Sequence, residues 1–163
     1  MNAPTSTFLD DDLLGLTEAI NHSLASDALR CQFTAMNWNI LAHYLQPFEL
    51  KSQQLLIQQG GRDRTLYFVE SGSLSVVQED DRSRVQTATV GPGSVIGEGA
   101  FFTGLPRSAS VSAATPCKLW CLTQIRFQDL ASRHSAIALE LTMSMAAVMG
   151  RRLCSSTKRI AVT

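Results

Sequence analysis

The sequence has no net charge and few charged residues of either sign. Its 163 residues hold 14 Lys and Arg against 14 Asp and Glu, and charged residues make up 17% of the chain. Proteins that cover nucleic acid with an extended surface usually carry a strongly basic domain or stripe. We therefore expect no direct binding of nucleic acid, whereas the balance leaves room for one small bound anion.

Cysteine pairs at the spacing of metal and redox motifs are also missing. The four cysteines, Cys31, Cys117, Cys121 and Cys154, are scattered, and no two lie three positions apart. Cys117 and Cys121 belong to an alternating segment, in which four residues of a strand span about 13 Å, too far for a shared ligand or a disulfide. The three histidines are dispersed as well. We expect reduced thiols, no metal, no cofactor and no enzymatic activity.

A secretory signal and a membrane-spanning stretch are absent from the sequence pattern. The first residues, MNAPTSTFLDDDLLGL, contain no basic segment followed by a long apolar run, as a signal peptide would. The most apolar stretch, residues 135–150, includes Glu140, Thr142 and Ser144, and it is shorter than the roughly 20 residues that a bilayer span needs. The pattern predicts a cytoplasmic protein without a membrane partner.

Length and periodicity predict one domain with a central β region, because a globular domain takes about 100 to 200 residues. Residues up to about 45 and after about 124 have helical patterns, whereas between them the apolar period falls to about two and turn residues recur. Many short strands with frequent turns are typical of an antiparallel sandwich or barrel. The expected strands are residues 55–58, 65–70, 73–78, 85–90, 108–113 and 118–122.

One long helix is predicted from Ser135 to Lys158. From Ser135 to Gly150 its only charged residue is Glu140, and its apolar residues form two neighbouring stripes. Because a helix that is apolar nearly all round must be covered on more than one side, we expect a second subunit to cover one of the stripes. Complete burial of the helix within its own domain is the alternative.

The most informative segment runs from Ile96 to Val111 and reads IGEGAFFTGLPRSASV. Its glycines permit close backbone approach, and the short helical turn between them presents free N–H groups to an anion. Arg107 supplies a planar, permanently charged fork that suits phosphate oxygens, and Ser108 adds a hydroxyl group. Together these residues predict a phosphate-binding site.

Glu98 is unexpected beside a phosphate, because a carboxylate repels it. An ionised carboxylate only accepts hydrogen bonds, so its natural target is a hydroxyl, and acidic side chains bind ribose hydroxyls in nucleotide sites. One Arg balanced by one Glu suits a monoanion, and the sequence lacks the Gly-x-x-x-x-Gly-Lys motif of polyphosphate sites. The pattern indicates a ligand with a ribose and a cyclic phosphodiester.

The order of residues in this segment resembles the phosphate-binding cassette of cyclic nucleotide-binding domains, as in bacterial catabolite activator proteins and protein kinase A regulatory subunits. Residues 66–74, LYFVESGSL, and residues 91–96, GPGSVI, resemble the family's strand-turn-strand and its approach to the cassette. The resemblance runs from about residue 34 to the end. It implies an α+β fold, an eight-stranded antiparallel jelly-roll β-barrel flanked by N-terminal helices and a long C-terminal dimerisation helix.

The resemblance also implies roles for individual residues. Glu98 would bind the ribose 2′-OH and Arg107 the cyclic phosphate, while neighbouring hydroxyl and backbone groups complete the cradle. Arg152 would pair with the glutamate, and Ser156 and Thr157 would reach the base from the two subunits. The full ligand-binding set implied in this way is Gly97, Glu98, Gly99, Ala100, Arg107, Ser108, Ala109, Arg152, Ser156 and Thr157.

The same resemblance implies how the chain is divided and what it binds. Residues 1–33 would form an N-terminal helical extension and residues 34–163 the cyclic nucleotide-binding domain. Within that domain we expect the jelly roll at about 46–123 and the C-terminal helices at about 124–160. The expected partners are a cyclic nucleotide and a second copy of the chain, bound through residues of about 135–158. The downstream protein partner stays open.

Ser108 bears on which nucleotide is bound. In the family a small residue at this position accompanies cAMP preference and a Thr accompanies cGMP preference, so we expect cAMP, with cGMP or a cyclic dinucleotide as alternatives. The resulting function is a sensor that transmits ligand binding through its C-terminal helix. Two other functions stay open: a sensor fragment of a transcription regulator whose helix-turn-helix domain lies outside this chain, and an oligomerisation module that binds no ligand.

Overall fold

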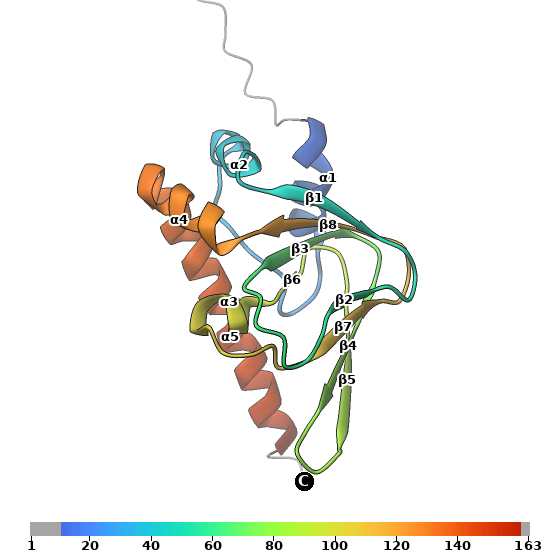
Figure 1. Ribbon diagram of the computed structural model, residues 1–163. Helices are drawn as coiled ribbons and strands as arrows, with labels where there is room; N and C mark the ends of the chain where they lie inside the picture. Colours follow the sequence, from blue (N-terminus) through green and yellow to red (C-terminus); the bar gives the residue numbers. More distant parts are fainter. Residues whose placement is uncertain (1–10, 161–163) are drawn as a thin grey trace, which may run out of the picture.

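The computed structural model describes residues 11–160, and the side chains of residues 13–155 within them. Strands alternate with short connections in the middle of the chain, and helices precede and follow them (Figure 1). The elements are α1 (Asp11–His22), α2 (Ala35–Ala42), β1 (Gln46–Leu50), β2 (Leu55–Ile57), β3 (Leu66–Ser71), β4 (Leu74–Glu79), β5 (Val85–Val90), β6 (Val95–Ile96), α3 (Glu98–Thr103), β7 (Ser110–Ala113), β8 (Cys117–Leu122), α4 (Gln124–Arg133) and α5 (Ser135–Ile160).

The strands form two four-stranded antiparallel sheets, in the orders β1-β8-β3-β6 and β2-β7-β4-β5. Strands far apart in the sequence pair with each other. Leu50 lies opposite Cys117 where β1 meets β8, and Val76 lies opposite Val111 where β4 meets β7. The β4–β5 hairpin extends beyond the rest of the sandwich (Figure 1). This arrangement confirms the expected α+β fold, an eight-stranded antiparallel jelly roll with a long C-terminal helix.

The sheet that contains β3 and β8 is buried on both faces, because successive side chains of a strand point to opposite sides. Phe68 and Trp120 face the helices and pack with Leu16 of α1 and Leu141 of α5. Leu119, next to Trp120 in β8, belongs instead to the core between the sheets. That inner core consists of Leu50, Ile57, Val69, Leu74, Ile96, Val111, Ala113, Cys117 and Leu119.

Helix α5 presents one side to the core between the helices and the sheet of β3 and β8, called the outer core here, and the opposite side to solvent. Ile137, Leu141, Met145 and Val148 are buried. The alternative of complete burial within its own domain is wrong, because other large apolar side chains of the same helix are well exposed: Leu139 at 63%, Met143 at 61% and Leu153 at 69%. Within the described part of the chain, no helix combines the length and hydropathy that crossing a bilayer requires.

Strands β1 and β6 are the two that periodicity did not reveal. β1 lies at the edge of its sheet, contains Pro47 and is exposed at four of its five residues, so it lacks the alternating apolar pattern. β6 is only two residues long. The strand expected from residue 108 begins at Ser110. In all three cases the pairing partner decides where the strand lies.

The turn between β3 and β4 depends on Gly72, whose φ is +87°. A Cβ atom there would lie 2.3 Å from the carbonyl oxygen of Pro116. We expect Gly72→Ala to lower the free energy of unfolding by about 2 kcal/mol or more, because a left-handed backbone alone costs roughly 1–2 kcal/mol in a residue with a side chain. Urea unfolding measures the change.

Gly91→Ala is the matched control for this substitution. Gly91 is not among the residues with positive φ, and its Cβ would meet nothing within 4 Å. We expect its free energy of unfolding to change by less than about 0.5 kcal/mol. An equal loss of stability in both variants would contradict the steric explanation.

Candidate functional site

The segment singled out by the sequence forms a short helix between β6 and β7. Helix α3 begins after Gly97, whose φ is +86°, and ends at Gly104, whose φ is +70°. Residues with side chains rarely adopt such angles, so glycine at both ends allows the chain to enter and leave one tight turn. Phe101 is fully buried in the outer core and holds α3 against the sandwich.

A cavity of about 520 Å³ opens beside α3. Its wall combines the cassette with the second sheet, the segment before α2 and the C-terminal part of α5. The cassette residues in the wall are Gly97, Glu98, Gly99, Ala100, Arg107, Ser108 and Ala109. The other lining residues are Ser26, Asp27, Ile57, Val76, Gln78, Ala88, Thr89, Val90, Ile96, Val111, Arg152 and Ser155.

The structure therefore brings eight of the ten residues of the expected ligand-binding set to one cavity. The remaining two, Ser156 and Thr157, continue the backbone of α5, but their side chains lie outside the described residues. Ser155, which the sequence analysis did not select, lines the cavity instead. The roles assigned to all ten residues stay predictions.

Arg107 is held almost entirely inside the protein, with a side chain that is 2% exposed. Its Nη1 donates to the carbonyl oxygen of Gly97 at 3.0 Å and its Nη2 to that of Thr65 at 2.7 Å. Its Nε donates to Asp63 Oδ2 at 3.1 Å, and its Nη2 also contacts the other oxygen of the same carboxylate. The guanidinium is thus fixed by two backbone carbonyls and one acid.

Asp63 is a partner of Arg107 that the sequence analysis missed. The hydrogen bond from Arg107 holds the pKa of this carboxyl below its usual range, although partial burial opposes the shift. Asp63 follows the turn Gly60-Gly61, which two backbone hydrogen bonds join to Arg107: Arg107 N donates to the carbonyl oxygen of Gly61 at 2.7 Å, and Gly60 N donates to that of Arg107 at 2.8 Å. No local pattern could have revealed this pair, because 44 residues separate Asp63 from Arg107.

Glu98 and Arg152 form the pair that the resemblance implied. Arg152 Nη1 lies 2.6 Å from Glu98 Oε1, its Nε lies 2.8 Å from Asp27 Oδ2, and its Nη2 donates to the carbonyl oxygen of Val95 at 2.9 Å. Burial lowers the pKa of the Arg152 guanidinium, but the nearby carboxylates of Glu98 and Asp27 more than offset this, and the net shift is upward. Asp27 is the second acid that the sequence analysis missed.

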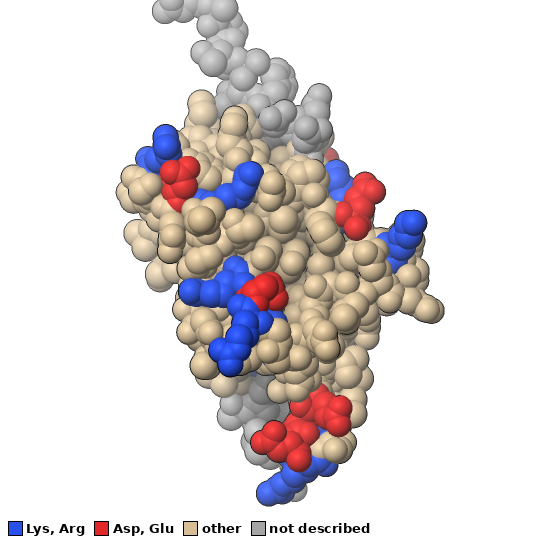
Figure 2. Space-filling view, viewed as in Figure 1, with Lys and Arg blue, Asp and Glu red and all other residues tan. Residues whose placement is uncertain are grey.

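The charges around the cavity are balanced. Among the described residues that line it, Asp27 and Glu98 carry negative charge and Arg107 and Arg152 carry positive charge. On the outer surface Figure 2 likewise shows acidic and basic side chains in small mixed groups on a largely uncharged face. A cavity with this balance suits a ligand of low charge better than a polyphosphate.

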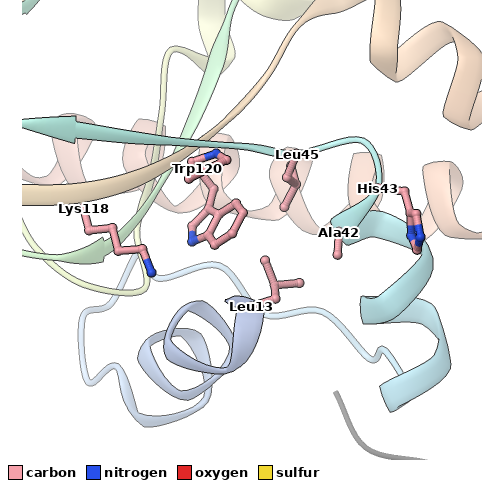
Figure 3. A pocket seen from close by; sticks show the side chains of 7 residues that line it. Leu13, Ala42, His43, Leu45, Lys118 and Trp120 are labelled. Atoms are coloured by element: carbon pink, nitrogen blue, oxygen red, sulfur yellow. The ribbon is translucent and has the colours of Figure 1, made fainter. Parts of the chain in front are cut away.

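A second cavity, of about 350 Å³, lies between α1, α2 and the β1–β8 edge (Figure 3). Leu13, Leu45 and Trp120 make its wall mostly apolar. Its one lysine, Lys118, has Nζ 3.0 Å from Glu70 Oε1, and no arginine lines it among the described residues. The first cavity is therefore the candidate site for an anion.

Among residues 13–155, whose side chains the structure describes, no group of three or more His, Cys, Asp or Glu could hold a metal ion. The cysteines are unpaired thiols within this range. Burial raises the pKa of the Cys31 thiol to about 11, so this sulfur remains protonated and a poor nucleophile at neutral pH.

Known proteins that are similar to this chain share one domain type. The family described as Cyclic nucleotide-binding domain matches residues 47–134, which is more than half of the chain. The cAMP-dependent protein kinase regulatory subunit of Yarrowia lipolytica is 35% identical over 86 residues, covering 53% of this chain and 22% of that protein. The cAMP-activated global transcriptional regulator CRP of Salmonella typhimurium is 32% identical over 111 residues, covering 67% of this chain and 51% of that protein.

The chain thus spans about half, or less, of the length of these relatives. Among solved structures, a cyclic nucleotide-binding domain from Methylobacillus flagellatus superposes with a TM-score of 0.79 at 23% identity, covering 90% of this chain and 81% of that one. At this identity the likeness concerns the fold. With the family match over residues 47–134, it leads to one conclusion: this chain belongs to the cyclic nucleotide-binding domain family.

Proposed function

We propose that this protein is a sensor that binds cAMP in the cavity beside α3 and transmits binding through α5. The observation that carries the proposal is that Arg107 and Glu98 line one cavity together with Arg152 of α5. A fixed cation suits a phosphate and an acid suits a sugar hydroxyl. The third residue connects the cavity to the long helix. A regulatory rather than an enzymatic role is part of this proposal.

Arg107 is suited to hold a phosphate because its own bonds are nearly complete. Four of its five N–H groups donate to Asp63, Gly97 and Thr65. One N–H on Nη1 has no partner among the described residues and can donate to a phosphate oxygen. The guanidinium needs no rearrangement to bind, which lowers the entropic cost of binding.

Glu98 is suited to accept a hydrogen bond from a ribose. Its Oε1 accepts from Arg152, which leaves Oε2 for a hydroxyl donor. Because Arg152 belongs to α5, a ligand bound to Glu98 stabilises the arrangement in which α5 lies against the cavity. Binding then shifts the population toward that arrangement, since the ligand binds it better than an open one.

cAMP is the proposed nucleotide for two reasons. Ser108 lines the cavity at the position where cAMP-binding members of the family carry a small residue. The two relatives described above are named as cAMP-dependent and cAMP-activated proteins. The cavity-lining charges balance before ligand binds, so a cyclic nucleotide adds one negative charge where a polyphosphate would add several.

Isothermal titration of the full chain tests this proposal. We expect cAMP to bind at one molecule per chain and cGMP to bind more weakly. Glu98→Gln should weaken cAMP binding by roughly 10- to 100-fold, because a hydrogen bond to a charged group is worth about 1.5–3 kcal/mol. Arg107→Lys should weaken it at least as much, because an ammonium cannot reproduce the four bonds of the fork.

Asp129→Asn is the control for these variants. It also removes a carboxylate that pairs with an arginine, Arg133, but on the exposed surface of α4. Its affinity for cAMP should equal that of the unmodified chain. Absence of heat with both cAMP and cGMP, in protein whose circular dichroism shows that it is folded, would overturn the proposal.

The ion pair of Asp63 and Arg107 gives the proposed phosphate site a pH dependence. Since the pKa of Asp63 is lowered in the folded state, the pair stabilises the fold above about pH 4, the range in which an unfolded aspartate is ionised. This stabilisation is lost as the pH falls through the lowered pKa. Asp63→Asn should therefore cost about 1 kcal/mol at pH 7, a modest value because Asp63 is half exposed and screened by solvent.

Thermal unfolding at pH 7 and at pH 3 measures this dependence. The difference in melting temperature between Asp63→Asn and the unmodified chain should shrink at the lower pH, because this aspartate is largely protonated in the unfolded chain at pH 3 and folding must then release the proton. A difference that grows toward pH 3 would contradict the assignment of the ion pair.

We also propose that the exposed side of α5 binds α5 of a second copy. Leu139, Met143 and Leu153 lie on that side, and the small residues Ala146 and Gly150, both exposed, lie between them. Small residues allow two helices to approach closely, while the larger ones fill the space at either end. A homodimer through residues of about 135–158 would bury this surface.

Sedimentation equilibrium tests the dimer. Met143→Glu should shift the chain to monomer, because a carboxylate would be buried without a partner in the interface. Ile125→Glu is the control, since Ile125 is 77% exposed but lies on α4. Equal effects of the two substitutions, or an unmodified chain that is monomeric at all concentrations, would contradict the proposal.

A further inference from the structure

The segment between α1 and α2, residues 23–34, runs along α5 and is called the strap here. It contains no helix or strand, yet it is tied to α5 at three points. Asp27 contacts Arg152, the carbonyl oxygen of Ala28 accepts from Arg151 at 2.8 Å, and Gln32 N donates to Glu140 Oε1 at 2.9 Å. Positions increase along the strap while they decrease along α5, so the two run antiparallel.

The strap is also tied to the sandwich. Leu29 N donates to the carbonyl oxygen of Gly93 at 3.0 Å, in the turn between β5 and β6, and the side chains of Ala28 and Leu29 are fully buried. At Gly93 a Cβ atom would lie 2.6 Å from the Cβ of Ser23, so the first residue of the strap packs directly on this turn. The strap therefore connects α5 to the jelly roll on the side of the cavity.

The end of the strap near α1 reaches the proposed nucleotide site. Ser26 and Asp27 line the cavity next to Arg152. Asp27 accepts a hydrogen bond from Nε of Arg152, while Glu98 and the carbonyl oxygen of Val95 accept hydrogen bonds from its two other nitrogens. The guanidinium is held at all three nitrogens, so the rotamer entropy of a free arginine side chain is already lost before ligand binds.

We infer that the strap is part of the wall of the nucleotide site and that Asp27, within it, is a positioning residue for this site. This inference rests on the proposed function. Asp27 acts through Arg152: by fixing this side chain it fixes Glu98, whose second oxygen is proposed to accept the ribose hydroxyl. A site whose side chains are already ordered before binding loses less conformational entropy when the ligand binds. Asp27 therefore raises the affinity for the nucleotide.

Charge repulsion acts in the opposite direction. Asp27 adds a negative charge to a cavity that is proposed to bind an anion, and removing it would favour binding if repulsion were the larger effect. Its charge, however, lies 2.8 Å from the Nε of Arg152, and the two charges largely cancel at a distance of several ångströms. Positioning therefore outweighs repulsion, and the sign of the effect on affinity separates the two.

A double-mutant cycle tests the inference on the full chain, with cAMP as the probe in isothermal titration. Asp27→Asn should weaken binding by about three- to tenfold, a range typical of coupling between residues in contact. In an Arg152→Ala background the same substitution should have no further effect, because the residue that it positions is absent. Asp129→Asn again serves as the carboxylate control and should leave the affinity unchanged.

A purely structural role of Asp27 would lower the affinity by the same factor in both backgrounds, and a purely repulsive role would make Asp27→Asn bind more tightly; either result overturns the inference. If Asp27→Asn does not fold, Asp27→Ser is measured in its place, with the same expectations. An unmodified chain that binds no cyclic nucleotide overturns the proposed function itself, whereas a chain that binds cAMP with equal affinity before and after Asp27→Asn overturns only the role of Asp27.

Discussion

A guanidinium that is buried away from water needs acceptors inside the protein, and this need organises the cassette end of the jelly roll. Arg107 donates hydrogen bonds to the carbonyl oxygens of Gly97 and Thr65 and to the carboxylate of Asp63. These residues belong to the start of the cassette, the entry to β3 and the loop after β2. A guanidinium without any of these acceptors at such a depth would cost several kcal/mol. The three segments therefore keep one arrangement, and the cassette has a fixed position relative to both sheets.

The sheet of β3 and β8 transmits that arrangement to the helices, because it is shared by two cores. Leu119 packs between the sheets and its neighbour Trp120 packs against the helices. Close-packed interiors resist changes of shape, so α1, α5 and the inner core constrain one another through this single sheet. Helix α1 belongs to the same core as α5. The division of the chain at residue 34 stays a prediction, and α1 shares side-chain contacts across it.

The sequence predicted the secondary structure correctly wherever the signal was a local pattern of apolar residues. Period-two runs predicted six strands, and the helical pattern up to about residue 45 agrees with α1 and α2, of which α2 begins at a capping box between Thr34 and Asn37. Strands β1 and β6 were not visible because an edge strand with a proline and a two-residue strand have no periodicity of their own. Such strands form because β8 and β3 pair with them, and this pairing cannot be seen in the local sequence.

The candidate site divides in the same way. Glu98, Arg107 and their glycines are close in sequence, so their chemistry could be read directly. Arg152 entered only through a resemblance, and Asp27 and Asp63 were missed. Each of these two acids pairs with an arginine 125 or 44 positions away, and nothing in the local pattern of an aspartate distinguishes an exposed one from the partner of a buried arginine.

The distance in sequence between Asp27 and Arg152 also affects the order of folding. Contacts between residues far apart in the chain form late, because the intervening loop must first lose its entropy. The jelly roll and its cassette lie between these two residues, so they can be assembled before the last turns of α5 are in place. The strap is synthesised early, but its contacts with α5 can form only after the last turns of that helix exist. During synthesis the cavity therefore lacks the part of its wall that Arg152 and Ser155 supply until the final helix has docked.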